Sequence, residues 1–258
     1  MRRLGRSERK GLTKPQLLIW GLMFVLAGII SRSILQNGIL HMNTLTGEEL
    51  LEKLSASATD MVVASVALLL QAVETCAIPI FAFLLVDGFV NGKDGKKLLL
   101  GLLVVAAVSE IPFNLATYGR LIHTATRNPA VALVIGLAVL YFFHRFEGNA
   151  FANVLIKLFV GIAAVLWAVM LNVEHGLPVL VVTMTMWALR NKKSMAILFG
   201  GAVASGCVIF SPFYIGAALG VLPIHFYKGE EEEKEIALPM YAIYPAMLAV
   251  FGLVSIFL

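Results

Sequence analysis

Nine apolar runs separated by short polar segments constrain this chain more than any other feature. They lie at residues 16–35, 61–90, 98–117, 130–143, 151–171, 176–189, 195–210, 212–227 and 237–258. Most are close to the ~20 residues that a helix needs to cross a hydrocarbon layer of roughly 30 Å. Only 14% of the residues are charged, against about a quarter in a typical soluble domain. The sequence therefore predicts an all-α, polytopic transmembrane helical bundle of about nine spans, with one domain over residues 1–258.

The basic residues are concentrated in alternate loops, as expected of a multi-pass membrane protein. Cytoplasmic loops of such proteins are enriched in lysine and arginine. If the N-terminus is cytoplasmic, four of the 20 lysines and arginines fall on the outer side: Arg32, Lys53, Arg120 and Arg127. We therefore predict a basic cytoplasmic tail at residues 1–15, followed by an anchor that is not cleaved, and an extracytoplasmic loop at residues 37–58.

Three local features refine this topology. Residues 47–54 have the pattern of a short amphipathic helix on the bilayer surface. The run over 61–90 is too long for one simple span, and we expect Pro79 to divide it, because proline interrupts the helical hydrogen-bond ladder. Ser211 and Pro212 predict a turn between two of the later runs.

Several kinds of site are not indicated. Cys76 and Cys207 lie inside apolar runs without metal-ligand spacing, which favours buried free thiols and no metal. The net charge of +4 comes from basic clusters between apolar runs, so it indicates topology and a lipid environment rather than nucleic-acid binding. The sequence has no P-loop and no nucleophile elbow.

Glu74 and Glu110 lie within apolar runs, where an ionisable side chain is costly and therefore a candidate for function. Helical rise places each carboxylate about 20 Å above the inner end of its span, so we expect both at one depth in the outer half of the membrane. Two interpretations follow. The glutamates form structural ion pairs with Arg120 or Arg127, or they line a polar pocket, open to the outer face, in which a proton is moved.

Polar residues next to other spans add to these two interpretations. Arg120, His123, Arg127 and Asn128 follow the Glu110 span, and Glu174 and His175 join two later spans. We expect His175 to find its partner in Glu110 or Glu74. At the inner end, a carboxylate lies beside three lysines, either as a structural pair or where the lysines attract an anionic cofactor; these residues are Asp87, Lys93, Lys96 and Lys97.

Two segments, Glu74–Phe89 (ETCAIPIFAFLLVDGF) and Ser109–Leu115 (SEIPFNL), resemble the TraX family. These are bacterial membrane proteins typified by the acetylase that modifies the N-terminus of conjugative pilin. The likeness covers most of the chain from Glu74 onward and continues at Arg127-Asn128-Pro129, Glu174-His175-Gly176 and Tyr244-Pro245. The family's Asp-His pair in the first helix and the histidine of its Tyr-Pro-x-His have no counterpart in Met23–Ala27 or Tyr244–Met247.

The resemblance implies a multi-pass acyltransferase of the bacterial cytoplasmic membrane. It would move an acetyl group from acetyl-CoA to an amine or hydroxyl on an exported peptide or glycan. The implied catalytic residues are Glu110 and His175, as base and orienter, and Glu74. The residues assigned to substrate contacts are Asn114, Arg127, Asn128 and Glu174. Arg127 or Asn128 would donate a hydrogen bond to the oxyanion. Coenzyme binding falls to Asp87, Lys93, Lys96 and Lys97.

Two other functions are compatible with the sequence. The chain could be a proton- or cation-coupled transporter in which Glu74 and Glu110 bind the ion, although the sequence has no internal repeat. It could also be a non-catalytic TraX-like protein with a role in interaction or assembly, which the two missing family histidines favour.

Overall fold

The computed structural model describes residues 11–92, 95–148, 150–228 and 238–258. Within these ranges the regular structure is helical, and the two β-bridges are isolated. In chain order the helices are α1 (Lys14–Ile30), the π-helix η1 (Ser31–Ile39), α2 (Gly47–Ala56), α3 (Ala58–Glu74), α4 (Ala77–Asn91), α5 (Gly95–Tyr118), α6 (Ala130–Arg145), α7 (Phe151–Met170), α8 (Gly176–Ala188), α9 (Lys193–Gly206), the 3-10 helices η2 (Cys207–Ile209) and η3 (Pro212–Gly220), α10 (Val221–His225), α11 (Leu238–Tyr241) and α12 (Ile243–Val254). Each apolar run of the sequence overlaps at least one of them.

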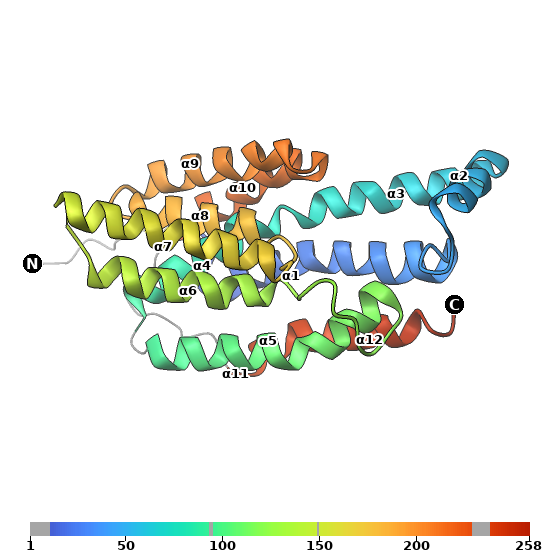
Figure 1. Ribbon diagram of the computed structural model, residues 1–258, viewed down its shortest axis with the longest axis horizontal. Helices are drawn as coiled ribbons and strands as arrows, with labels where there is room; N and C mark the ends of the chain where they lie inside the picture. Colours follow the sequence, from blue (N-terminus) through green and yellow to red (C-terminus); the bar gives the residue numbers. More distant parts are fainter. Residues whose placement is uncertain (1–10, 93–94, 149, 229–237) are drawn as a thin grey trace, which may run out of the picture.

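The helices lie roughly along one long axis (Figure 1). Among the described residues, four helical stretches are long and apolar enough to cross a membrane: Lys14–Ile39, Ala58–Asn91, Gly95–Tyr118 and Phe151–Met170. The other apolar helices have 10–17 residues. On α7, large side chains such as Leu158, Phe159 and Trp167 are exposed, as expected of a helix that faces lipid. The fold is therefore that of a helical membrane protein.

The long stretch 58–91 is broken into α3 and α4 at Thr75 and Cys76. Pro79 lies in the first turn of α4, and its ring nitrogen cannot donate to the carbonyl four residues earlier, which belongs to Thr75. The prediction that Pro79 divides this run is confirmed, with the break one turn before the proline. Glu74 is the last residue of α3, so its side chain leaves the helix directly at the break.

The π-helix η1 continues α1 and contains five polar residues. Three of their side chains donate to backbone carbonyls of neighbouring helices. The hydroxyl of Ser31 donates to Ala67 O at 2.7 Å, and that of Ser33 donates to Ala116 O at 2.9 Å. The amide of Asn37 donates to Ala116 O and Thr117 O. Because these polar groups have hydrogen-bond partners, η1 can be buried in the bundle, and Arg32 lies inside the bundle with it.

Short polar and turn-forming segments behave as the sequence predicts. The amphipathic segment 47–54 falls within α2, which is capped by Thr46 and Glu49 and contains no buried residue. Phe210 and Ser211 separate η2 from η3, which begins at Pro212. Cys76 and Cys207 are buried free thiols, as expected.

Two apolar cores lie side by side in the bundle. The larger is built mainly from α4, α6, α8 and α9 and includes Ile80, Leu140 and Leu180. The smaller joins α1, α5 and α12 through Ile29, Phe113, Ala116 and Leu248. Close approach of small residues allows this packing: a Cβ at Gly252 of α12 would lie 3.0 Å from the backbone nitrogen of Ala116 on α5. The candidate site lies where elements of both cores meet.

Candidate functional site

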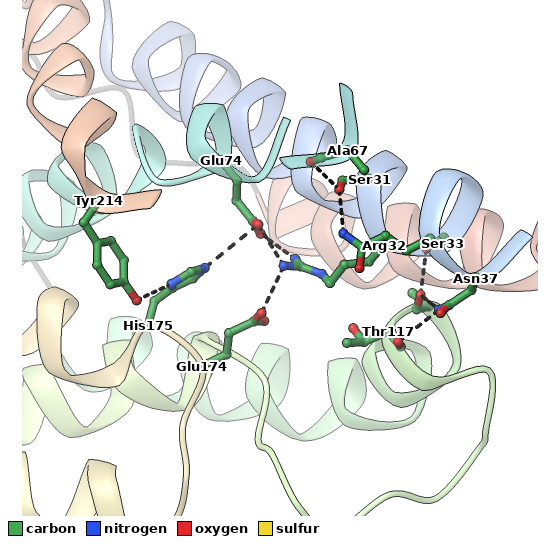
Figure 2. Close-up of polar contacts among 12 residues, drawn as sticks. Ser31, Arg32, Ser33, Asn37, Ala67, Glu74, Thr117, Glu174, His175 and Tyr214 are labelled. Atoms are coloured by element: carbon green, nitrogen blue, oxygen red, sulfur yellow. Dashed lines mark hydrogen bonds and ion pairs between the residues drawn. The ribbon is translucent and has the colours of Figure 1, made fainter. Parts of the chain in front are cut away.

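A buried arginine joins two carboxylates from distant parts of the chain. Arg32 projects from η1 and its guanidinium makes a two-point contact with Glu74, with N–O distances of 2.8 and 2.5 Å. Its Nη1 also lies 3.0 Å from Oε1 of Glu174, in the loop before α8. The side chains of Arg32 and Glu74 are 11% and 4% exposed. Figure 2 shows the three side chains converging from η1, α3 and that loop.

His175 completes this group, which we call the Arg32 cluster (Arg32, Glu74, Glu174, His175 and Tyr214). Its Nδ1 is 2.9 Å from the hydroxyl of Tyr214 on η3. Its Nε2 points toward Glu74 (Figure 2), 3.9 Å from Oε2, which is too far for a hydrogen bond. Among the described residues Nε2 is buried without a hydrogen-bond partner, and so is Oε2 of Glu174.

The backbone at His175 is held in an unusual conformation. It precedes α8 with φ of 54° and ψ of 15°, in the left-handed region. A side chain other than glycine is uncommon there, and such strain is often found at functional sites. The conformation turns the imidazole back toward Glu74 while the preceding residue reaches Arg32.

The charge of the cluster is not balanced by its own members. One guanidinium faces the carboxylates of Glu74 and Glu174, so with a neutral imidazole the sum is one negative charge. A buried net charge is costly unless it is paired. The Arg32 cluster therefore favours a bound cation or a protonated imidazole.

A second polar group surrounds Glu110 on α5. Its Oε1 lies 3.0 Å from Nη1 of Arg127, and its Oε2 accepts from Nδ2 of Asn128 at 2.6 Å. Nδ2 of Asn128 also donates to Ala106 O at 2.9 Å, and the residue is fully buried. Glu110 thus fixes the turn that starts α6.

Backbone hydrogen bonds join the second group to the Arg32 cluster. The N–H of Arg127 donates to Asn172 O at 3.1 Å, and the N–H of Glu174 donates to Arg127 O at 3.0 Å. This contact is the isolated bridge between Arg127 and Val173. The Glu110 group therefore helps to hold the loop that carries Glu174 and His175.

A cavity of about 150 Å³ begins at the Arg32 cluster. Glu74, His175 and Tyr244 line it at this end. It follows α4 from Ala77 to Leu85, a distance of roughly 12 Å by helical rise. The rest of its wall is almost entirely aliphatic or aromatic and comes from α1, α5, α6, α8 and the last helices: Leu18, Leu22, Val25, Leu98, Leu102, Val105, Pro129, Ala130, Leu133, Val179, Met240 and Tyr241 among them.

The family model described as TraX protein matches residues 56–255, which is most of the chain. The chain belongs to the TraX family. No curated protein and no solved structure gives a match. In this TraX member, the motif segments that are far apart in the sequence meet at the cavity: Glu74, Pro129, His175 and Tyr244 all line it.

In this TraX protein, one of the two glutamates has a different partner from the one predicted from the sequence. The pairing of Glu74 with Arg120 or Arg127 was wrong: its guanidinium partner is Arg32. The pairing of Glu110 with Arg127 is confirmed. Glu110 contacts Arg127 and Asn128, whereas Glu74 is the carboxylate that approaches His175. The two glutamates belong to two neighbouring polar groups.

The predicted residues Asn114, Arg120 and His123 have no contact with Glu74 or Glu110 among those described above. Asn114 is buried on α5, with no hydrogen-bond partner for its Oδ1 among the described residues. Arg120 is exposed, and the imidazole of His123 stacks on Tyr118 at 3.9 Å. The donors of Arg127 and Asn128, predicted for an oxyanion, are directed at Glu110.

The predicted coenzyme residues gather at the opposite end of the cavity. The carboxylate of Asp87 is 2.9 Å from Nζ of Lys14 and accepts from Asn91. Lys96 and Lys97 are exposed at the start of α5, next to Leu98 in the cavity wall. Lys93 lies outside the described residues, as do residues 1–10 of the predicted basic tail.

The sequence did not indicate Arg32 or Tyr214 as site residues, and it gave Tyr244 only as part of the family motif. Arg32 was counted as an outer-side charge, although it falls inside the apolar run 16–35, where an arginine is itself a signal of function. It also lies before the segment matched by the family. No local pattern marks Tyr214, because it approaches His175 only through tertiary packing.

Proposed function

We propose that this protein is a TraX-type membrane acyltransferase, which transfers an acetyl group from acetyl-CoA to an amine of an exported acceptor, a peptide or glycan. One observation carries the proposal. Residues from separate family motifs meet at the end of an apolar cavity, and there the imidazole of His175 has a free nitrogen beside Glu74. A histidine oriented by one neighbour and faced by a carboxylate is a suitable general base.

The chemistry uses one of the two tautomers that the contact between His175 and Tyr214 allows. If Nδ1–H of His175 donates to the hydroxyl of Tyr214, Nε2 is free to take a proton. The acceptor nitrogen attacks the thioester carbonyl carbon, so that a C–N bond forms and the C–S bond breaks. The proton of the amine passes to Nε2 and then to the coenzyme thiolate. Glu74 stabilises the imidazolium while Arg32 holds the carboxylate in place.

In this proposal Glu110 is a positioning residue. It fixes Arg127 and Asn128, and their backbone fixes the loop of Glu174 and His175. The basic start of α5, with Lys96 and Lys97, remains the proposed place where the phosphates of the coenzyme are attracted.

We further propose a multi-pass arrangement in the bacterial cytoplasmic membrane, with nine spans and the N-terminus inside. The distribution of charge supports it. Contacts among the described residues bring Lys14, Arg190 and Lys193 to one end of the bundle, through Asp87, Glu147 and Tyr227. Such a basic end is typical of the cytoplasmic side.

The proposal is tested by transfer of labelled acetyl from acetyl-CoA, using the purified full chain in nanodiscs and a panel of peptides and amino sugars. Loss of a general base lowers such rates by roughly 10²–10⁴, so His175→Ala should reduce transfer at least a hundredfold. His144→Ala is the matched control, since His144 is exposed. Transfer that survives His175→Ala would contradict the mechanism, and no transfer to any acceptor would favour a non-catalytic role.

A second pair of variants tests the carboxylate. Glu74→Gln keeps the size of the side chain but removes the charge that faces the imidazolium, so transfer should fall while the protein still folds. Glu48→Gln, on the exposed helix α2, should have no effect. Equal activity of the two variants would remove Glu74 from the mechanism.

A further inference from the structure

The apolar cavity at the Arg32 cluster has the chemistry of a site for one hydrocarbon chain. Its wall over Leu85, Leu98, Leu102 and Val105 offers no hydrogen-bonding side chain. A ligand segment rich in hydrogen-bonding groups would lose its water there without replacement, which is costly. An alkyl chain loses nothing and gains contacts with the wall.

The polar end of the cavity indicates what the chain carries. The carboxylates of Glu74 and Glu174 share one guanidinium, which leaves one negative charge when His175 is neutral. Oε2 of Glu174 and Nε2 of His175 are buried without hydrogen-bond partners among the described residues. An ammonium or amine group would supply both a positive charge and donors for these atoms.

We propose that this cavity binds a lipid with a primary amine in its head group, with the amine at Glu74 and His175 and a hydrocarbon chain toward Leu98. That this lipid is the acyl acceptor rests on the proposed function; the binding itself does not. If it is, the amine acceptor of the proposed function is this lipid, or an exported amphiphile of the same chemistry.

The test uses a long-chain alkyl amine with a photoactivatable diazirine in its chain, added to the full protein in nanodiscs without acetyl-CoA. Labelled residues are located by mass spectrometry. We expect cross-links to residues of the wall, such as Leu85 and Leu102. The alcohol and sulfonate of the same chain length serve as the neutral and anionic probes. Because a hydrogen bond to a charged group contributes about 1.5–3 kcal/mol, the amine should label about tenfold or more above the alcohol.

Matched variants on α5 separate the cavity from the lipid-facing surface. Leu102→Trp and Val105→Phe fill the cavity and should lower labelling about tenfold. Leu103→Trp and Val104→Phe change exposed neighbours and should leave labelling unchanged. Glu174→Gln should reduce the preference for the amine over the alcohol. If one cavity variant fails to fold, the other gives the answer.

Three outcomes would overturn the inference. Equal labelling by the sulfonate would show that charge does not select the ligand. Cross-links confined to exposed positions such as Leu103 would show surface partition only. Displacement by a peptide with an apolar N-terminus would assign the cavity to that ligand. Since no transfer is measured, a protein without acyltransferase activity could still bind the amine, and the two proposals fail separately.

Discussion

At the scale of single residues, Arg32 determines whether the site can exist. Without its guanidinium, a protonated His175 would be the one cation among the described residues beside the buried carboxylates of Glu74 and Glu174. Removal of one partner from a buried ion pair costs about 3–5 kcal/mol, because the other charge remains desolvated. The two-point geometry with Glu74 also requires an arginine rather than a lysine.

Arg32→Met should therefore lower the free energy of unfolding by several kcal/mol, and Arg32→Lys by a smaller amount. The double variant Arg32→Met with Glu74→Gln should recover part of the loss, since it removes one of the isolated charges. Thermal unfolding in detergent measures the effect. Arg120→Met, at an exposed position, is the control. A melting curve for Arg32→Met that matches the wild type would mean that the ion pair is not buried as described.

Gly28 gives a second prediction at this scale, because its substitution should act with the opposite sign to the usual one. Glycine to alanine in a helix normally stabilises by up to about 1 kcal/mol. A Cβ at Gly28, however, would collide with the carboxylate of Glu74. Gly28→Ala should therefore displace Glu74 and destabilise the protein, whereas Gly206→Ala, where the Cβ meets open space, should be neutral or stabilising. Thermal unfolding of both variants decides it; two stabilised variants would contradict the close contact.

The sequence identifies most residues of the site but not their partners. Glu74, Glu110 and His175 are recognisable because an ionisable group in an apolar run needs a reason to be there. Which cation each glutamate contacts depends on how each helix is rotated about its own axis. The hydropathy pattern that locates the helices does not determine this rotation. The charge pattern counts Arg32 among the outer-side residues, although it lies inside the apolar run 16–35 and on a helix that continues to Ile39.

At the scale of elements, helix location follows from the sequence and helix geometry does not. The apolar runs coincide with helices. Pro79 marks the break between α3 and α4 because a proline nitrogen cannot donate a hydrogen bond to the carbonyl four residues earlier. The π-helix η1 has no such local cause. It depends on acceptors supplied by Ala67 and Ala116 on other helices, and those are set by the packing of the whole bundle.

Helix α2 gives a prediction about pH at the scale of an element. The backbone N–H and the hydroxyl of Thr46 donate to Glu49 at 2.7 and 2.9 Å, and these bonds hold the pKa of the Glu49 carboxyl below its usual value. The stabilisation is present above the unfolded pKa of about 4.3 and is lost as pH falls through the lower, folded value. Amide exchange in α2, corrected for intrinsic rates, should accelerate over that range.

Variants of Glu49 and of its neighbour Glu48 form a matched pair that tests this helix cap. Glu49→Gln should remove most of the pH dependence of α2, whereas Glu48→Gln, also exposed in the first turn, should keep it. Thr46→Ala should cost about 1 kcal/mol of helix stability at neutral pH. Exchange in α2 that is the same for all three variants would show that the cap does not hold this helix.

At the scale of the whole molecule, charge distinguishes the two ends of the bundle. Figure 1 shows α2 and the start of α3 at the end opposite to the start of α9. The basic contacts of Lys14, Arg190 and Lys193 lie at the α9 end. This polarity favours a cytoplasmic α9 end and an extracytoplasmic α2.

This orientation predicts the accessibility of introduced thiols in intact cells. Cys76 and Cys207 are buried, so the wild type should react little with a membrane-impermeant maleimide. Glu52→Cys on α2 and Arg120→Cys after α5, both exposed, should be labelled from outside. Lys192→Cys, exposed before α9, should be labelled only after permeabilisation, because the proposed arrangement of nine spans with the N-terminus inside places that loop in the cytoplasm. Labelling of all three from outside would contradict the span count, and the reverse pattern would invert the membrane orientation and with it the side from which the coenzyme must enter.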